Sequence, residues 1–236
     1  MKRIFLLGLL FCSLGSLLLA VQPPVGETLV YDLTYVGFNS GYMKVKAVAE
    51  MSLEEFLQQK NVQPYAEFYQ NIIPKINTAN EKVVLLRVET SVEQLDKAED
   101  IYMLSGANLP LFFQQYAFSG AETITLFDPF TYKTKTISAE ETKVRSFPSP
   151  VTEPITFLYY MRNHRSNNYQ LLLSDQEFSY SKIGEETLKY QGKDVPTIIL
   201  KSEPTKMRIW LSNDDRRLPL QLAYDFFLGS VMVTLR

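Results

Sequence analysis

The chain is poor in the two residue types that carry most metal and thiol chemistry, with one cysteine and one histidine among 236 residues. Cys12 lies in an apolar leader, so the domain that follows can form no disulfide and has no thiol nucleophile. A single imidazole, that of His164, excludes most familiar metal sites and most nucleophile–histidine pairs. The sequence therefore predicts no metal, no cofactor and no thiol chemistry.

The chain also lacks a basic cluster. Lys2 and Arg3 are the only charged residues among the first twenty, which leaves 22 basic and 26 acidic residues in the remainder, a net charge of −4. This balance disfavours nucleic-acid binding and electrostatic docking onto membranes.

Residues 1–20 have the pattern of a secretory signal peptide. A positive start at Lys2 and Arg3 precedes an apolar run at 4–11, and the small residue Ala20 ends the segment. This order of charge, apolar run and small residue is typical of exported proteins.

Two other interpretations of this segment are open. Residues 4–20 are only slightly shorter than the roughly 20 apolar residues that span a bilayer, which would suit an uncleaved anchor. Lipidation of Cys12 is disfavoured because the bulky Phe11 precedes it. We expect cleavage, so that residues 21–236 form a single exported, β-rich domain in the periplasm or associated with the envelope.

The strongest structural signal is the alternation of apolar and polar residues between positions 206 and 235. A period of two is typical of strands with one face on a core. Turn formers at Ser212–Asp215 and Gly229 divide the segment into three antiparallel strands. The positions that share a face are Met207, Ile209, Leu211, Leu218, Leu220, Leu222, Tyr224, Phe226, Val231, Val233 and Leu235.

Similar patterns along the rest of the chain predict many more strands, with Gly37 and Asn39–Gly41 turning the first strand into the second. The predicted strands are 29–35, 43–50, 82–92, 95–105, 110–118, 123–127, 131–137, 169–173, 178–188 and 194–201.

Helices are predicted at three places only. A capping box at Ser52 predicts a short helix, and Tyr65–Tyr69 is a second helix or an ordered loop. Thr152 as N-cap and Pro154 in the first turn predict one amphipathic helix at 153–163. The fold class is therefore mainly β, with a single large curved antiparallel sheet, an unclosed half-barrel, and two or three short helices.

Seven stretches in this chain, in this order, resemble a family of exported bacterial proteins known only as domain of unknown function 3108. Residues 52–80 do not fit the resemblance, and we interpret them as an insertion. The matching stretches are Val25–Tyr31, Asn39–Gly41, Asp128–Pro129, Glu153–Arg162, Gly192–Lys193, Ile209–Leu220 and Gly229–Val231.

More distantly, the hairpin from Trp210 to Leu220 is similar to hairpins of periplasmic lipoprotein carriers and of a related envelope-stress regulator. That similarity implies an unclosed half-barrel with an apolar concave face, which binds acyl chains or lipidated partners and catalyses no reaction. It is a likeness of fold, and fold alone does not fix function.

The acidic residues form no catalytic arrangement. Asp214 and Asp215 are adjacent in a turn beside Arg216 and Arg217, which suits loop charges that neutralise one another better than a pair for acid–base catalysis. His164 follows the end of the predicted helix, where a cationic imidazole suits the helix dipole. The sequence predicts no catalytic residue.

Aromatic residues make up 13% of the chain. Core filling is the simplest account. The alternative is that a half-open sheet leaves a groove for an acyl chain, because so few helices cannot cover it. Trp210, opposite Ile209 and Leu211, either packs in a second layer or lines this groove. The candidate groove residues are Tyr31, Leu33, Tyr35, Phe127, Tyr159, Trp210, Tyr224 and Phe226.

Two functional hypotheses follow from these patterns. The first is a non-enzymatic periplasmic binding or carrier module for a lipid or a lipidated protein. The second is a structural or regulatory component of envelope assembly, acting through sheet edges or residues 52–80. An enzyme ranks third.

Overall fold

The computed structural model describes residues 23–76, 81–92, 95–116, 122–173, 176–226 and 229–236. The predicted signal peptide, residues 1–20, lies outside this part. The strands are β1 (Thr28–Tyr35), β2 (Phe38–Met51), β3 (Val83–Val92), β4 (Leu95–Leu104), β5 (Pro110–Tyr116), β6 (Glu122–Asp128), β7 (Lys133–Ile137), β8 (Thr142–Ser146), β9 (Val151–Thr152), β10 (Asn168–Leu173), β11 (Gln176–Tyr190), β12 (Lys193–Glu203), β13 (Arg208–Ser212), β14 (Pro219–Phe226) and β15 (Gly229–Leu235). The helices are α1 (Leu53–Leu57), η1 (Gln63–Tyr65), α2 (Ala66–Tyr69), η2 (Ile73–Lys75) and α3 (Pro154–Asn163).

All fifteen described strands belong to one sheet, and every neighbouring pair is antiparallel except β9 with β10. β1 pairs with both β2 and β15, so the first and last strands meet inside the sheet. The two free edges are β8 and β9, which are consecutive in the chain. The predicted fold class is confirmed as mainly β, with one large curved antiparallel sheet that does not close.

The predicted turn at Gly37 is confirmed, but the Asn39–Gly41 turn is wrong. Val36 and Gly37 form the turn between β1 and β2, with φ of 48° and 83°. Asn39–Gly41 instead lies within β2, beside a shift in register against β1. Gly41 is required there, because a Cβ atom would approach the carbonyl oxygen of Ser91 on the neighbouring strand to 1.9 Å.

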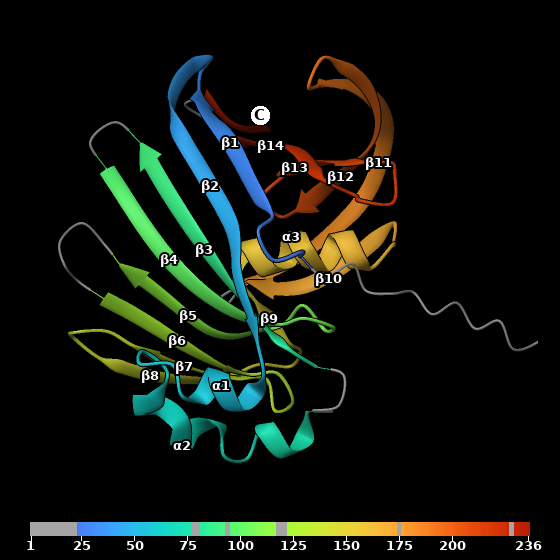
Figure 1. Cartoon of the computed structure of the whole chain (residues 1–236). Helices are drawn as coiled ribbons and strands as arrows, with labels where there is room; N and C mark the ends of the chain where they lie inside the picture. The colour runs from blue at the N-terminus through green and yellow to red at the C-terminus, as the bar shows by residue number, and fades with distance from the viewer. Residues whose placement is uncertain (1–22, 77–80, 93–94, 117–121, 174–175, 227–228) are drawn as a thin grey trace, which may run out of the picture.

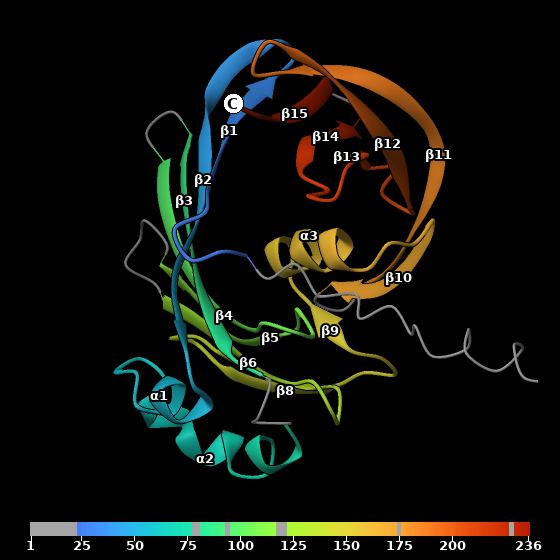
Figure 2. The same ribbon diagram turned by 45° about the vertical axis from the view of Figure 1, so that its right-hand side comes forward.

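The sheet curls around helix α3. Figure 2 shows α3 enclosed by β1, β2 and the strands from β10 to β15. Eight of the ten α3 residues are buried, so the prediction of an amphipathic helix with one polar face is wrong. The reason is tertiary, because a curved sheet covers sides of the helix that a flat sheet would leave in solvent.

The start of α3 also differs from the prediction. Glu153, and not Thr152, is the N-cap, and its carboxylate accepts hydrogen bonds from the backbone N–H groups of Ile155 and Thr156. Pro154 occupies the first helical position, where its missing N–H group has no cost. The residue before it therefore becomes the cap, even though a glutamate is not among the preferred capping residues.

Residues 52–76 form a layer that packs on the other half of the sheet, as Figures 1 and 2 show for α1 and α2. The predicted capping box is present, with the Ser52 side chain accepting from the backbone N–H of Glu55. Phe56 and Tyr69 are fully buried and share a core cluster with residues of β3 to β6, including Phe112. This segment is thus an integral layer of the fold.

A buried hydrogen bond helps to fix this layer to the sheet. The Tyr69 hydroxyl donates to the backbone carbonyl of Leu111 in β5 at 2.6 Å, and both residues are buried. We expect Tyr69→Phe to lower the free energy of unfolding by about 1–2 kcal/mol, because the carbonyl loses its side-chain partner. Urea denaturation followed by circular dichroism measures the change. An unchanged midpoint would contradict this docking of the layer.

In the described ranges, no helix has the length and apolar character needed to cross a membrane.

Candidate ligand-binding cleft

The concave face of the sheet carries an apolar strip across β1, β15 and β14. The register pairs Leu33 with Val233 and Val233 with Leu222, which places the three side chains in one row. A second row pairs Tyr35 with Val231 and Val231 with Tyr224. We call these six residues the apolar strip: Leu33, Tyr35, Leu222, Tyr224, Val231 and Val233.

Exposure rises along the strip with distance from α3. Tyr31, which precedes Leu33 on the same face of β1, is fully buried in the core around the helix. Leu33 is half-buried, and Tyr35 at the end of the strand is 40% exposed. The helix therefore fills one end of the concave face and leaves the other end open.

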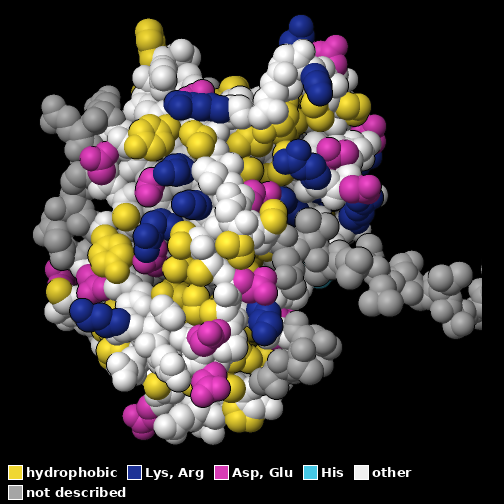
Figure 3. Space-filling model, viewed as in Figure 1, with side chains coloured by type: hydrophobic (Ala, Val, Ile, Leu, Met, Phe, Trp, Pro, Cys, Tyr) yellow, Lys and Arg dark blue, Asp and Glu magenta, His cyan; other side chains and the backbone are white. Residues whose placement is uncertain are grey.

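A cleft of about 290 Å³ lies between the tip of the β11–β12 hairpin and the β13–β14 loop. Leu218 and Leu220 form the buried apolar floor of this cleft, next to a register shift between β13 and β14. Half-buried Tyr190 and Val195 form one wall and pack against the same core cluster. In Figure 3, hydrophobic side chains lie between the two arms formed by β1–β2 and β11–β12.

The border of the cleft is polar. Its polar and charged lining residues are Gln191, Lys193, Ser212, Asp214 and Arg216. Asp214 holds the loop in shape, since its Oδ1 accepts hydrogen bonds from the Ser212 hydroxyl at 2.6 Å and from the backbone N–H groups of Arg216 and Arg217 at 3.2 and 3.1 Å. An apolar floor with a polar border suits an amphipathic ligand.

A buried ion pair is linked by a hydrogen bond to the loop that borders the cleft. Arg162 on α3 contacts Glu27, just before β1, through two hydrogen bonds of 2.7 and 2.9 Å. The Tyr159 hydroxyl donates to the same carboxylate at 3.2 Å, and the Arg162 Nε atom donates to the carbonyl of Arg216 at 3.3 Å. Burial alone would lower the pKa of the Arg162 guanidinium, but the Glu27 carboxylate holds this pKa above its usual value. This network joins the N-terminal segment, the helix and the cleft loop.

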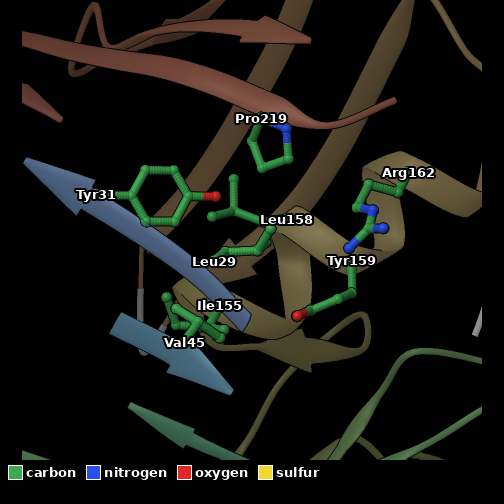
Figure 4. Close-up of a pocket in the computed structure, with 8 residues that line it drawn as sticks. All are labelled: Leu29, Tyr31, Val45, Ile155, Leu158, Tyr159, Arg162 and Pro219. Atoms are coloured by element: carbon green, nitrogen blue, oxygen red, sulfur yellow. The ribbon is translucent and has the colours of Figure 1, made fainter. Parts of the chain in front are cut away.

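Two of the predicted groove residues, Tyr31 and Tyr159, lie in the core close to this ion pair. Tyr31 and Tyr159 line a cavity of only about 10 Å³, with the Tyr31 hydroxyl pointing into it (Figure 4). Burial raises the pKa of both phenols above the ordinary value, and the charge of Glu27 adds to the rise at Tyr159. A space of this size holds about one water molecule and cannot hold an acyl chain.

The other predicted residues are divided among three places. Leu33, Tyr35 and Tyr224 belong to the apolar strip. Phe127 lies in a separate small cluster with Val151 and Leu172. Phe226 ends β14, and its side chain lies outside the described part of the chain.

Trp210 lies on the opposite face of the sheet from the apolar strip. It is 5% exposed, its indole N–H donates to the Glu186 carboxylate, and the guanidinium of Arg208 lies 5.3 Å from the ring centroid. Its register partner is Gln221, whereas Leu222 of the strip pairs with Ile209, the residue before Trp210. Trp210 therefore packs on the outside of the curve.

The charged loop and the histidine have structural partners. Asp215 pairs with Arg165 at 2.7 Å, so the expectation that it is neutralised by Arg216 and Arg217 is wrong. The β13–β14 hairpin brings it against the segment after α3, which the sequence pattern does not reveal. His164 is the C-cap of α3, with its ring stacked on Tyr160 at a centroid distance of 4.0 Å.

Sequence reasoning missed the cleft residues Tyr190, Val195, Lys193 and Arg216. They come from two successive hairpins, and the fold of these hairpins brings their tips together. The alternation grouped Leu218 and Leu220 with Leu222, but a register shift between β13 and β14 interrupts that alternation.

A second hollow of about 420 Å³ lies between α1 and the start of β3. One of its lining residues, Glu81, directly follows residues 77–80 in the sequence, which lie outside the described ranges, and we assign the hollow no ligand. Its lining residues are Ser52, Leu53, Glu54, Leu57, Ile73, Glu81 and Lys82.

Fold and cleft together define a half-barrel of antiparallel strands with a plugged end and an open apolar face. The chain belongs to the family described as "Protein of unknown function (DUF3108)", whose model matches residues 75–236. The resembling stretches from Asp128 onward lie inside this match, whereas Val25–Tyr31 and Asn39–Gly41 lie before it.

No curated protein matches the chain. Among solved structures, the chain is similar to the crystal structure of a β-barrel-like protein of domain of unknown function DUF1849 from Brucella abortus. The two share 10% sequence identity over 89% of this chain and 94% of the other, with a TM-score of 0.49.

Proposed function

We propose that the protein is a non-enzymatic binding or carrier module for a lipid or a lipidated protein, exported to the periplasm. The observation that carries this proposal is the open cleft of about 290 Å³ with its buried leucine floor, in a sheet that also exposes part of the apolar strip. An acyl chain laid there gains about 0.8 kcal/mol for each methylene removed from water. The signal-like residues 1–20 support export.

The surroundings of the cleft favour binding over catalysis. Its one lining carboxylate, on Asp214, is occupied in holding the loop. The only histidine is stacked at the end of α3 and does not line the cleft. The Ser212 hydroxyl beside the Asp214 carboxylate is 1% exposed and also holds the loop, since it donates to that carboxylate and accepts from the backbone N–H of Leu218 at 2.7 Å.

Titration with a fluorescent fatty-acid probe tests the proposal. We expect saturable binding to the wild-type protein and at least about tenfold weaker binding to Val195→Asp. The new carboxylate would place a charge against the apolar wall, while Val195 is only half-buried and the fold should persist.

Val144→Asp is the matched control, because Val144 is 66% exposed on the edge strand β8. Its affinity should equal that of the wild type. Absence of probe binding to the wild-type protein, or equal binding to Val195→Asp, would refute the assignment of the cleft.

A role in envelope assembly through a sheet edge is the second candidate. All five residues of β8 are exposed, and this strand pairs only with β7, which leaves its outer backbone groups open to a further strand. Cross-linking from position 144 would detect a strand added at this edge, and purely monomeric, partner-free protein in envelope extracts would count against it.

A further inference from the structure

Two cations border the cleft without an acidic partner. Lys193 at the start of β12 and Arg216 in the β13–β14 loop both line it and are both exposed. Across the described residues, neither side chain takes part in an ion pair. By contrast, Arg162 is paired with Glu27 and Arg165 is paired with Asp215.

The acidic residues nearby do not cancel this charge. Asp194 follows Lys193, but alternation along β12 places it on the other face, while Lys193 and Val195 both line the cleft. Asp215 is fully exposed and held by Arg165. Asp214 is the one lining carboxylate, so the charged residues that line the cleft, Lys193, Arg216 and Asp214, keep an excess of positive charge.

A third cation lies immediately behind the loop. Arg217 is only 7% exposed, and its Nε atom has no hydrogen-bond partner in the described part of the chain. Its guanidinium contacts the Tyr169 hydroxyl at 3.4 Å, a neutral group. Burial lowers the pKa of Arg217, the direction expected for a cation that no carboxylate compensates. It therefore adds positive potential to the loop that carries Arg216.

We propose that the cleft selects an anionic amphipath, whose acyl chain lies on Leu218 and Leu220 and whose carboxylate or phosphate headgroup lies between Lys193 and Arg216. This inference rests on the proposed function and specifies its ligand. A guanidinium matches both carboxylate and phosphate in geometry, and hydrogen bonds between ionised groups are stronger than neutral ones. The apolar wall formed by Tyr190 and Val195 places the end of the chain next to these cations.

The test compares ligands that share one tail: dodecanoate, dodecyl phosphate, dodecanol and dodecyltrimethylammonium, each below its micelle concentration, in displacement of the fluorescent probe. We expect the two anions to bind about tenfold more tightly than dodecanol, and the cation to bind most weakly. A preference for the phosphate over the carboxylate would assign a phospholipid as the source, and the reverse would assign a free fatty acid.

Variants place the selectivity at the two cations. Lys193→Gln combined with Arg216→Gln should remove the preference for anions, so that the two anions bind no more tightly than dodecanol. Lys189→Gln is the matched control, since Lys189 is exposed on the same hairpin and does not line the cleft. It should keep the full preference.

The outcomes separate this inference from the proposed function. Equal binding of dodecanol and the anions, or an anion preference that survives the double variant, would overturn the headgroup assignment and leave the binding function intact. Failure of every ligand to bind would overturn both.

Discussion

Replacing Arg162 by methionine is expected to lower the free energy of unfolding by about 3–5 kcal/mol, because it leaves the Glu27 carboxylate buried without its cation. The Arg162 side chain is 2% exposed and that of Glu27 is 11% exposed, so water cannot replace the lost partner. The carbonyl of Arg216 and the Tyr159 hydroxyl lose part of the same network. Urea denaturation monitored by circular dichroism measures the loss.

Lys44→Met provides the control, because Lys44 and Glu89 form a pair of similar length, 3.1 Å, in which the side chains are 36% and 46% exposed. This variant should cost less than about 1 kcal/mol. Adding Glu27→Gln to Arg162→Met should recover part of the loss, since the unpaired charge is removed. Equal losses in the free energy of unfolding for Arg162→Met and Lys44→Met would contradict the account of the buried pair.

The second large effect is a dependence of stability on pH that originates at Glu153. Burial raises the pKa of this carboxyl to about 7 from an ordinary value of 4.5, against the lowering effect of its hydrogen bonds with Ile155 and Thr156, and Glu99 adds a smaller rise. The folded state therefore binds a proton more tightly than the unfolded chain. This contribution to stability is complete below pH 4.5 and is lost as the pH rises through about 7.

With about 1.4 kcal/mol for each pKa unit, the loss amounts to roughly 3 kcal/mol between acidic and slightly alkaline pH. Glu153→Gln should flatten the dependence, because the amide keeps a neutral group at the N-cap. Glu153→Asp keeps a titrating cap and should retain part of the dependence. The free energy of unfolding, measured by urea titration across this range, provides the comparison, and a wild-type curve that rises steadily through it would rule out this role.

Local patterns determined much of the fold. Alternation from Met207 to Leu235 predicted the final meander, and the Ser52 capping box predicted α1. The pairing of β1 with β15, and the free edges at β8 and β9, depend on contacts between distant segments that no local period encodes. The burial of α3 on nearly all sides has the same origin.

The candidate site divides in the same way. The alternation with a period of two identified the face of the strands that carries the apolar strip. Leu33, Tyr35 and Tyr224 share that face as the alternation requires. Phe127 and Trp210 were grouped with them by residue type, but Phe127 packs in another cluster and Trp210 faces outward. The sequence around Lys193 and Arg216 does not mark them as site residues, because only the fold of the two hairpins brings them to one cleft.

Native mass spectrometry of the protein isolated from the cell envelope without detergent tests the central claim most directly. The account predicts a mass above that of the polypeptide by that of an acyl-bearing ligand. The added mass should disappear on denaturation, appear as lipid in the extract and be absent from Val195→Asp. A bare polypeptide mass for the wild-type protein, together with lipid-free extracts, would contradict it.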